Sequence, residues 1–111
     1  MTLQREIVLV PFPFSDQTGN KVRPALVLSK DSFNSKSKDT IICGITSNLS
    51  KDFYSVLISP KDLEEGRIET SIAKVENLAK IEQRLVIKKI GKLNTARFEQ
   101  ILDILTSLFK D

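Results

Sequence analysis

The chain has 111 residues, of which 41% are hydrophobic and 28% charged, with a formal net charge of +3. This composition fits one globular domain spanning residues 1–111 and excludes an intrinsically disordered chain. No apolar run approaches the roughly 18–20 residues of a membrane-spanning helix, so we expect no membrane segment.

The lack of histidine and the single cysteine exclude several kinds of site. A Ser-His-Asp or Cys-His nucleophile and a structural zinc site need side chains that the chain does not have. We therefore expect neither a metal nor another cofactor. The lone Cys43 cannot form an internal disulfide, which indicates a cytoplasmic protein. The mildly basic charge permits a nucleic-acid partner without requiring one.

Three apolar runs rich in β-branched residues predict strands in the first half of the chain. They cover residues 6–10, 24–29 and 40–45. Two prolines follow the first run closely, and because proline lacks a backbone donor, that strand should end, bulge or lie at an edge there. Residues 15–21 are a turn-rich loop, and residues 30–39 are a polar connection.

The second half of the chain predicts further short strands and one helix. Strands are expected over residues 53–59 and 69–75, with possible additions at 78–81 and 85–90 and a loop with a helical turn at 61–66. Apolar residues at helical spacing predict a helix over residues 95–109, with Asn94 or Thr95 as its N-cap.

These elements predict a mainly β fold with a C-terminal α-helix. Five to seven short antiparallel strands followed by one helix are typical of a small, strongly bent sheet or half-open barrel. Several of the strands are apolar at nearly every position, so both faces of the sheet should be covered.

Three segments of the chain resemble the MazF/PemK family of toxin endoribonucleases. They are the first strand with its prolines, Lys21-Val22-Arg23-Pro24-Ala25-Leu26-Val27-Leu28-Ser29, and Ile45-Thr46-Ser47. The resemblance extends over nearly the whole chain. It implies an SH3-like barrel that forms a homodimer, cleaves single-stranded RNA sequence-selectively without a metal, and is inhibited by the antitoxin of a type II toxin–antitoxin pair.

The resemblance implies three catalytic residues, Arg23, Thr46 and Glu76. Metal-free cleavage by attack of the 2′-oxygen needs a base, an acid and positive charge on the phosphoryl oxygens. The planar guanidinium of Arg23 suits that charge, and the hydroxyl of Thr46 can donate to a phosphate oxygen. Glu76 is the expected base. Read from the residues alone, each is also compatible with an ordinary surface role.

Further residues are expected to contact RNA. Lys74 lies two positions before Glu76, so the two side chains share one strand face, as they also would in an exposed ion pair. Many family members carry an arginine shortly after the acid, whereas this chain has Leu78-Ala79-Lys80, and Lys80 is the expected substitute. The remaining candidates are Asp16, Gln17, Lys21, Ser47, Asn48 and Asn77.

The alternative function is a non-catalytic binding protein on the same barrel, either a nucleic-acid binder or a toxin that binds a topoisomerase as the gyrase poisons do. For the leading function, the expected antitoxin carries an acidic, disordered C-terminal segment that enters the cationic cleft. Phe98 and Phe109 on the predicted helix suggest an apolar surface that a second copy of the chain would cover.

Overall fold

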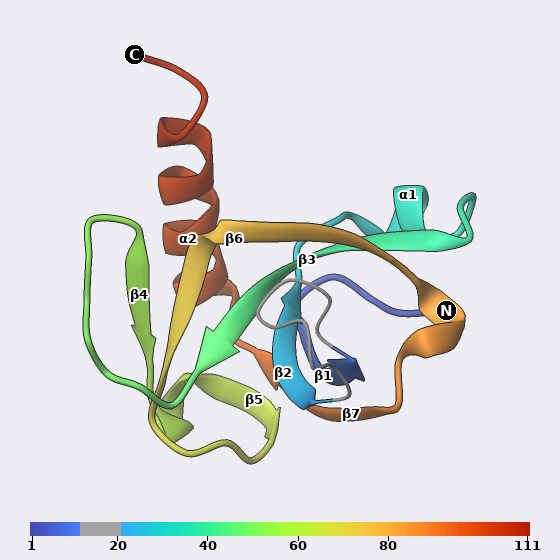
Figure 1. Ribbon diagram of the computed structural model, residues 1–111, viewed down its shortest axis with the longest axis horizontal. Helices are drawn as coiled ribbons and strands as arrows, with labels where there is room; N and C mark the ends of the chain where they lie inside the picture. Colours follow the sequence, from blue (N-terminus) through green and yellow to red (C-terminus); the bar gives the residue numbers. More distant parts are fainter. Residues whose placement is uncertain (12–20) are drawn as a thin grey trace.

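One curled antiparallel sheet forms most of the molecule in the computed structural model, which describes residues 1–11 and 21–111. Within these residues the strand order is β4-β6-β3-β2-β1-β7-β5, and the sheet bends into a half-barrel (Figure 1). The strands are β1 (Glu6–Pro11), β2 (Val22–Val27), β3 (Asp39–Thr46), β4 (Ser55–Ile58), β5 (Leu63–Gly66), β6 (Ser71–Glu82) and β7 (Lys88–Leu93). The predicted mainly β fold with a C-terminal helix is confirmed.

The C-terminal helix α2 (Thr95–Ser107) packs against β6 and β4, and its far end extends beyond the sheet (Figure 1). Its N-cap is Asn94, one of the two predicted candidates, and the side-chain oxygen of Asn94 accepts a hydrogen bond from the Arg97 backbone N–H at 2.8 Å. Phe98 and Ile101 anchor the helix because both are buried against the sheet. Of the two phenylalanines expected on an apolar surface, Phe98 therefore belongs to the core of the chain, and Phe109 is 76% exposed.

The strands bury side chains on both faces, as the continuous apolar runs predict. On the face toward α2 the core includes Ile7, Leu26, Cys43, Val75, Leu93, Phe98 and Ile101. The opposite face holds a second cluster, formed by Val8, Val10, Ala25, Val27, Ile42 and Ile81. The polar ends of β2 and β3 extend from this second face and carry the candidate site.

The two strands predicted at residues 69–75 and 78–81 are one long, bent strand, β6. Its register against β3 shifts between Gly44, which pairs with Lys74, and Cys43, which pairs with Leu78. The extra residues 75–77 form a bulge, and a bulge bends a strand without ending it. The polar pair Glu76-Asn77 looks like a strand end in the sequence because it occupies this bulge.

Three further elements differ from the sequence prediction. The helical turn predicted within residues 61–66 is present as a 3₁₀ turn (Pro60–Asp62), but the predicted loop after it is the edge strand β5, whose charged side chains do not give an apolar run. The last strand, β7, starts three residues later than predicted, at Lys88. The polar connection 30–39 contains a short helix, α1 (Asp31–Asn34).

Gly66 ends β5 in a conformation that requires glycine. Its φ is 79°, and a Cβ at this position would overlap the carbonyl oxygen of Ile90 on β7. The residues after Gly66 therefore leave β5 in one fixed direction, toward the ends of β2 and β3.

We expect Gly66→Ala to destabilise the fold by about 2 kcal/mol or more, because it adds left-handed strain to a clash with backbone. Chemical denaturation with a linear fit measures this loss. Thr70→Ala, at an exposed position in the same connection, is the matched control and should change stability by less than about 0.5 kcal/mol. Equal stabilities for the two variants would contradict this account of Gly66.

Candidate functional site

The pairing of β2 with β3 brings together two predicted site residues. Ala25 of β2 lies opposite Gly44 of β3. Continuing this antiparallel register by two residues places Arg23 opposite Thr46, where both strands reach their ends. Directly opposed residues of an antiparallel pair project to the same face. The guanidinium and the hydroxyl therefore belong to one surface.

A cleft of about 580 Å³ opens at these strand ends. We call it the β2–β3 cleft. Its walls come from the start of β2, the end of β3, the connection from β5 to β6, and β7. Its lining residues are Lys21, Val22, Arg23, Pro24, Ile45, Thr46, Ser47, Arg67, Ile68, Glu69, Ser71 and Ile90. Four of the predicted site residues, Lys21, Arg23, Thr46 and Ser47, thus share one cleft.

Arg23 has unused hydrogen-bonding capacity in the cleft. Its Nε atom is buried and has no hydrogen-bond partner among the described residues. Arg23 also makes no ion pair with a described carboxylate. A buried donor without a partner is unfavourable, so an anionic oxygen entering the cleft would satisfy a group that the fold leaves unsatisfied.

The hydroxyl of Thr46 is oriented by the turn that follows β3. Its oxygen accepts a hydrogen bond from the Asn48 backbone N–H at 3.1 Å. The hydroxyl hydrogen therefore remains available for donation into the cleft. The Asn48 side chain is engaged differently, because its oxygen accepts from the Ser50 N–H at 3.1 Å. Asn48 stabilises the turn and does not line the cleft, whereas its neighbour Ser47 does.

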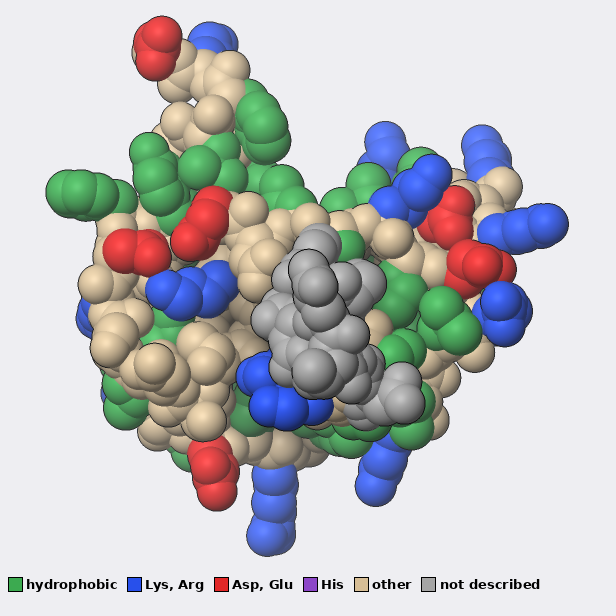
Figure 2. All heavy atoms as spheres, viewed as in Figure 1, with side chains coloured by type: hydrophobic (Ala, Val, Ile, Leu, Met, Phe, Trp, Pro, Cys, Tyr) green, Lys and Arg blue, Asp and Glu red, His purple; other side chains and the backbone are tan. Residues whose placement is uncertain are grey.

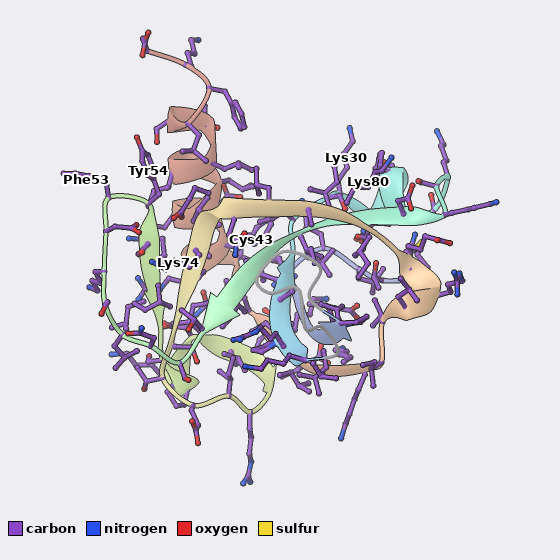
Figure 3. The ribbon with its side chains drawn as sticks, in the orientation of Figure 1. Lys30, Cys43, Phe53, Tyr54, Lys74 and Lys80 are labelled. Carbon is purple, nitrogen blue, oxygen red and sulfur yellow. The ribbon has the colours of Figure 1, made fainter. Side chains whose placement is uncertain are left out.

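Lys74 lies on the same sheet face as Thr46, since it pairs with Gly44, two residues before Thr46. Its ammonium is held by Asp52, with 3.0 Å between Nζ and Oδ2. Figure 3 shows Lys74 beside β4, on the opposite side of the view from Lys30 and Lys80. The hydrogen bond from Lys74 is the main cause of a lowered pKa at Asp52. The Lys74 ammonium is thus already paired with the Asp52 carboxylate in the structure.

Glu76 and Asn77 lie in the β6 bulge and outside the lining of the β2–β3 cleft. Glu76 is exposed, and Asn77 is half-buried. Burial, with a smaller contribution from the charge of Glu76, raises the pKa of Cys43 to about 12. The thiol therefore stays protonated at neutral pH and is not a nucleophile.

Lys80 belongs to a different surface hollow of about 590 Å³, which it lines with Lys38 and Asp39. Its ammonium lies 3.7 Å from a carboxylate oxygen of Asp39. Exposed lysines surround this end of the molecule (Figure 2). The structure does not bring Lys80 to Arg23 and Thr46. Asp16 and Gln17 lie outside the described residues.

Two charged residues of the β2–β3 cleft, Arg67 and Glu69, were not singled out from the sequence. They come from the connection between β5 and β6, far along the chain from Arg23. Their position depends on the non-local contact of Gly66 with Ile90. The local sequence signal is Gly66 directly before Arg67, and a glycine before an arginine does not by itself indicate a site.

In residues 1–11 and 21–111 no group of three or more Cys, Asp or Glu side chains is arranged to hold a metal ion. No helix in the same part of the chain is long and apolar enough to cross a membrane.

Comparison with known proteins gives a family and a fold. A family model described as PemK-like, MazF-like toxin of type II toxin–antitoxin system matches residues 3–109. A search of curated proteins finds no match.

Solved structures similar to the chain include several toxins of this kind. A mycobacterial endoribonuclease in complex with its cognate antitoxin has a TM-score of 0.79 at 15% identity, covering 96% of this chain and 93% of the other. MazF from Deinococcus radiodurans has 0.78 at 19%, covering 96% and 94%. Toxin MazF-mt6 from Mycobacterium tuberculosis has 0.76 at 17%, covering 95% and 96%. The TM-scores and coverages show that the chain shares their fold.

We expect Lys74→Met to raise the pKa of Asp52 toward its ordinary value, because the first cause of the lowered pKa is removed. In the native chain the pair persists above the lowered pKa of Asp52 and is lost as pH falls through it. Carboxyl ¹³C shifts followed against pH measure this.

Asp62 is the internal control for that titration. Burial opposes its ionisation, but hydrogen bonds from Ser59 and the nearby Arg97 still lower its pKa. Its titration should not change in the Lys74→Met protein. An unchanged pKa at Asp52 would contradict the assigned pair.

Proposed function

The chain belongs to the PemK-like, MazF-like toxins of type II toxin–antitoxin systems, and we propose that it is a metal-independent endoribonuclease that cleaves single-stranded RNA sequence-selectively. The observation that carries this proposal is the β2–β3 cleft, in which Arg23 lies opposite Thr46 and its Nε has no hydrogen-bond partner in the described part of the chain. A cation and a neutral hydroxyl on one surface suit a phosphodiester.

The proposed reaction is a transesterification within RNA. The 2′-oxygen forms a bond to the adjacent phosphorus while the bond from phosphorus to the 5′-oxygen breaks. A base takes the 2′-OH proton and an acid protonates the leaving 5′-oxygen. The products are a 2′,3′-cyclic phosphate and a 5′-hydroxyl, so neither water nor a metal enters the cleavage step.

Arg23 and Thr46 stabilise the charge that develops on the phosphoryl oxygens. The guanidinium supplies positive charge and can donate two hydrogen bonds to one phosphate, and the Thr46 hydroxyl adds a donor without further charge. Both groups come from paired strands, so they do not have to reorganise during the reaction. Lys21 and Ser47 would extend the contacts to neighbouring phosphates and sugars.

Two carboxylates compete for the role of the base. Glu76 occupies the position that the family resemblance indicates, two residues after Lys74. Glu69 is the one carboxylate among the described residues that line the β2–β3 cleft. The two candidates can be separated by experiment, since Glu76 lies in the β6 bulge and Glu69 lies before β6 begins.

We propose a homodimer and an antitoxin partner. Large apolar side chains, including Phe53, Ile87 and Phe109, are exposed at several places, and a second copy of the chain would cover some of them. The related mycobacterial endoribonuclease was solved with its cognate antitoxin. An acidic antitoxin segment would suit a cleft lined by Lys21, Arg23 and Arg67.

A non-catalytic binding protein is the second candidate function. Two observations favour it: Lys80, the expected substitute for a family arginine, lies in a different hollow, and Lys74 is already paired with Asp52. A binder of this kind would retain nucleic-acid or protein binding without producing RNA fragments.

We expect purified protein to cut a long single-stranded RNA into discrete fragments in EDTA. Arg23→Ala should slow cleavage by about 100-fold or more, since one lost donor to transition-state charge has effects of that size. Thr46→Val should act in the same direction. Arg84→Ala, an exposed arginine outside the cleft, is the control and should cut at the native rate.

Intact RNA in every reaction would reject the enzyme and favour the binding protein. A strict need for Mg²⁺ or Mn²⁺ would reject the reaction class, because metal-assisted hydrolysis uses an activated water. Thermal melts of each variant confirm that the loss of rate is not a loss of fold.

The base is identified by comparing Glu76→Gln with Glu69→Gln. We expect one substitution to remove the acidic limb of the pH–rate profile and to lower the rate about 100-fold or more, as loss of a general base does. The other should leave the profile's shape unchanged. Unchanged profiles for both variants would mean that neither Glu69 nor Glu76 is the base.

A further inference from the structure

The arginines of the chain fall into two groups. Three lie outside the β2–β3 cleft, and each is ion-paired: Arg5 with Glu64 at 3.0 Å, Arg84 with Glu82 at 3.0 Å, and Arg97 with Asp62 at 3.4 Å. The other two, Arg23 and Arg67, both line the cleft. Neither makes an ion pair with a described carboxylate. Among residues 1–11 and 21–111, the two arginines that share the cleft are therefore the two without an ion-pair partner.

Arg67 is held in place by its backbone. Its N–H donates to the carbonyl oxygen of Ile90 at 3.2 Å, directly after Gly66 packs against the same carbonyl. Arg23 enters the cleft from β2, whereas Arg67 enters from the connection between β5 and β6. Two cations thus stand on separate walls of one cleft, each on a backbone fixed by β-sheet contacts.

The apolar residues that line the β2–β3 cleft suit the ribose and base that lie between two phosphates of RNA. Val22, Ile68 and Ile90 contribute apolar surface, and the Val22 residue is 50% exposed. Apolar side chains can pack against a ribose or a base, while the cations on the walls attract phosphates. Glu69 offsets only part of the positive charge of Lys21, Arg23 and Arg67.

We propose that Arg67 binds a second phosphate, next to the one held by Arg23 and Thr46, so that the cleft recognises a segment of RNA with at least two phosphodiesters. The identification of the ligand as RNA rests on the proposed function. Arg67 is assigned to binding and positioning and takes no part in proton transfer. Its effect should therefore depend on how many phosphates the ligand carries.

Short 2′-O-methylated oligonucleotides of mixed sequence test this, because they cannot be cleaved. A dinucleotide carries one phosphodiester and a trinucleotide two. NMR titration should show the native protein binding the trinucleotide roughly ten-fold more tightly, the effect of one charge-assisted contact. Arg67→Gln should remove most of that difference, leaving only the packing of the third nucleoside, and should leave the dinucleotide affinity unchanged. Arg67→Lys should restore part of it.

Arg84→Gln is the matched control, since it removes the same charge from an exposed arginine outside the cleft. It should retain the native difference between the two probes. For a longer oligonucleotide, Arg67→Gln should also reduce the salt dependence of binding by about 0.7 in log–log slope, the value for one phosphate contact on a single strand.

Two results would overturn the inference. One is an Arg67→Gln protein that keeps the native preference for the trinucleotide. The other is equal weakening of both probes by Arg67→Gln and Arg84→Gln, which would show diffuse charge attraction and no second phosphate site. Because the probes are not cleaved, a protein that binds as expected but leaves RNA intact would reject the proposed reaction and retain the Arg67 assignment.

Discussion

The pairing register of β2 with β3 is the constraint on which the candidate site depends. With Ala25 opposite Gly44, the next cross-strand positions of the same face are Arg23 and Thr46. A slip of one residue would turn one of the two side chains to the opposite face. The register is fixed by apolar residues buried on both faces of these strands, so the packing that stabilises the sheet also assembles the cleft.

Charge distribution completes the site. Arg5, Arg84 and Arg97 are ion-paired, and Lys74 is held by Asp52, whereas Arg23 and Arg67 make no ion pair with a described carboxylate. A net charge of +3 spread evenly would say little about a partner. Two guanidinium groups without a described ion-pair partner in one cleft support the proposed anion site, and RNA is the proposed anion to test first.

The sequence predicts those parts of the fold and site that depend on local patterns. Apolar runs identified β1, β2 and β3, and Asn94 was among the expected helix caps, because both signals lie within a few residues. The bulge that joins two predicted strands into β6 reflects pairing with β3, which no local pattern encodes. Arg67 was missed for the same reason, since a contact between distant strands brings it to the cleft.

The central claim is that Arg23 and Thr46 act together on one phosphate. A double-mutant cycle on single-turnover RNA cleavage tests it most directly, using Arg23→Ala, Thr46→Val and the combined protein. Groups that share one transition-state charge are strongly non-additive. The double variant should therefore be about as slow as Arg23→Ala alone. Rate losses that simply multiply would show that Arg23 and Thr46 act independently and would contradict a shared phosphate.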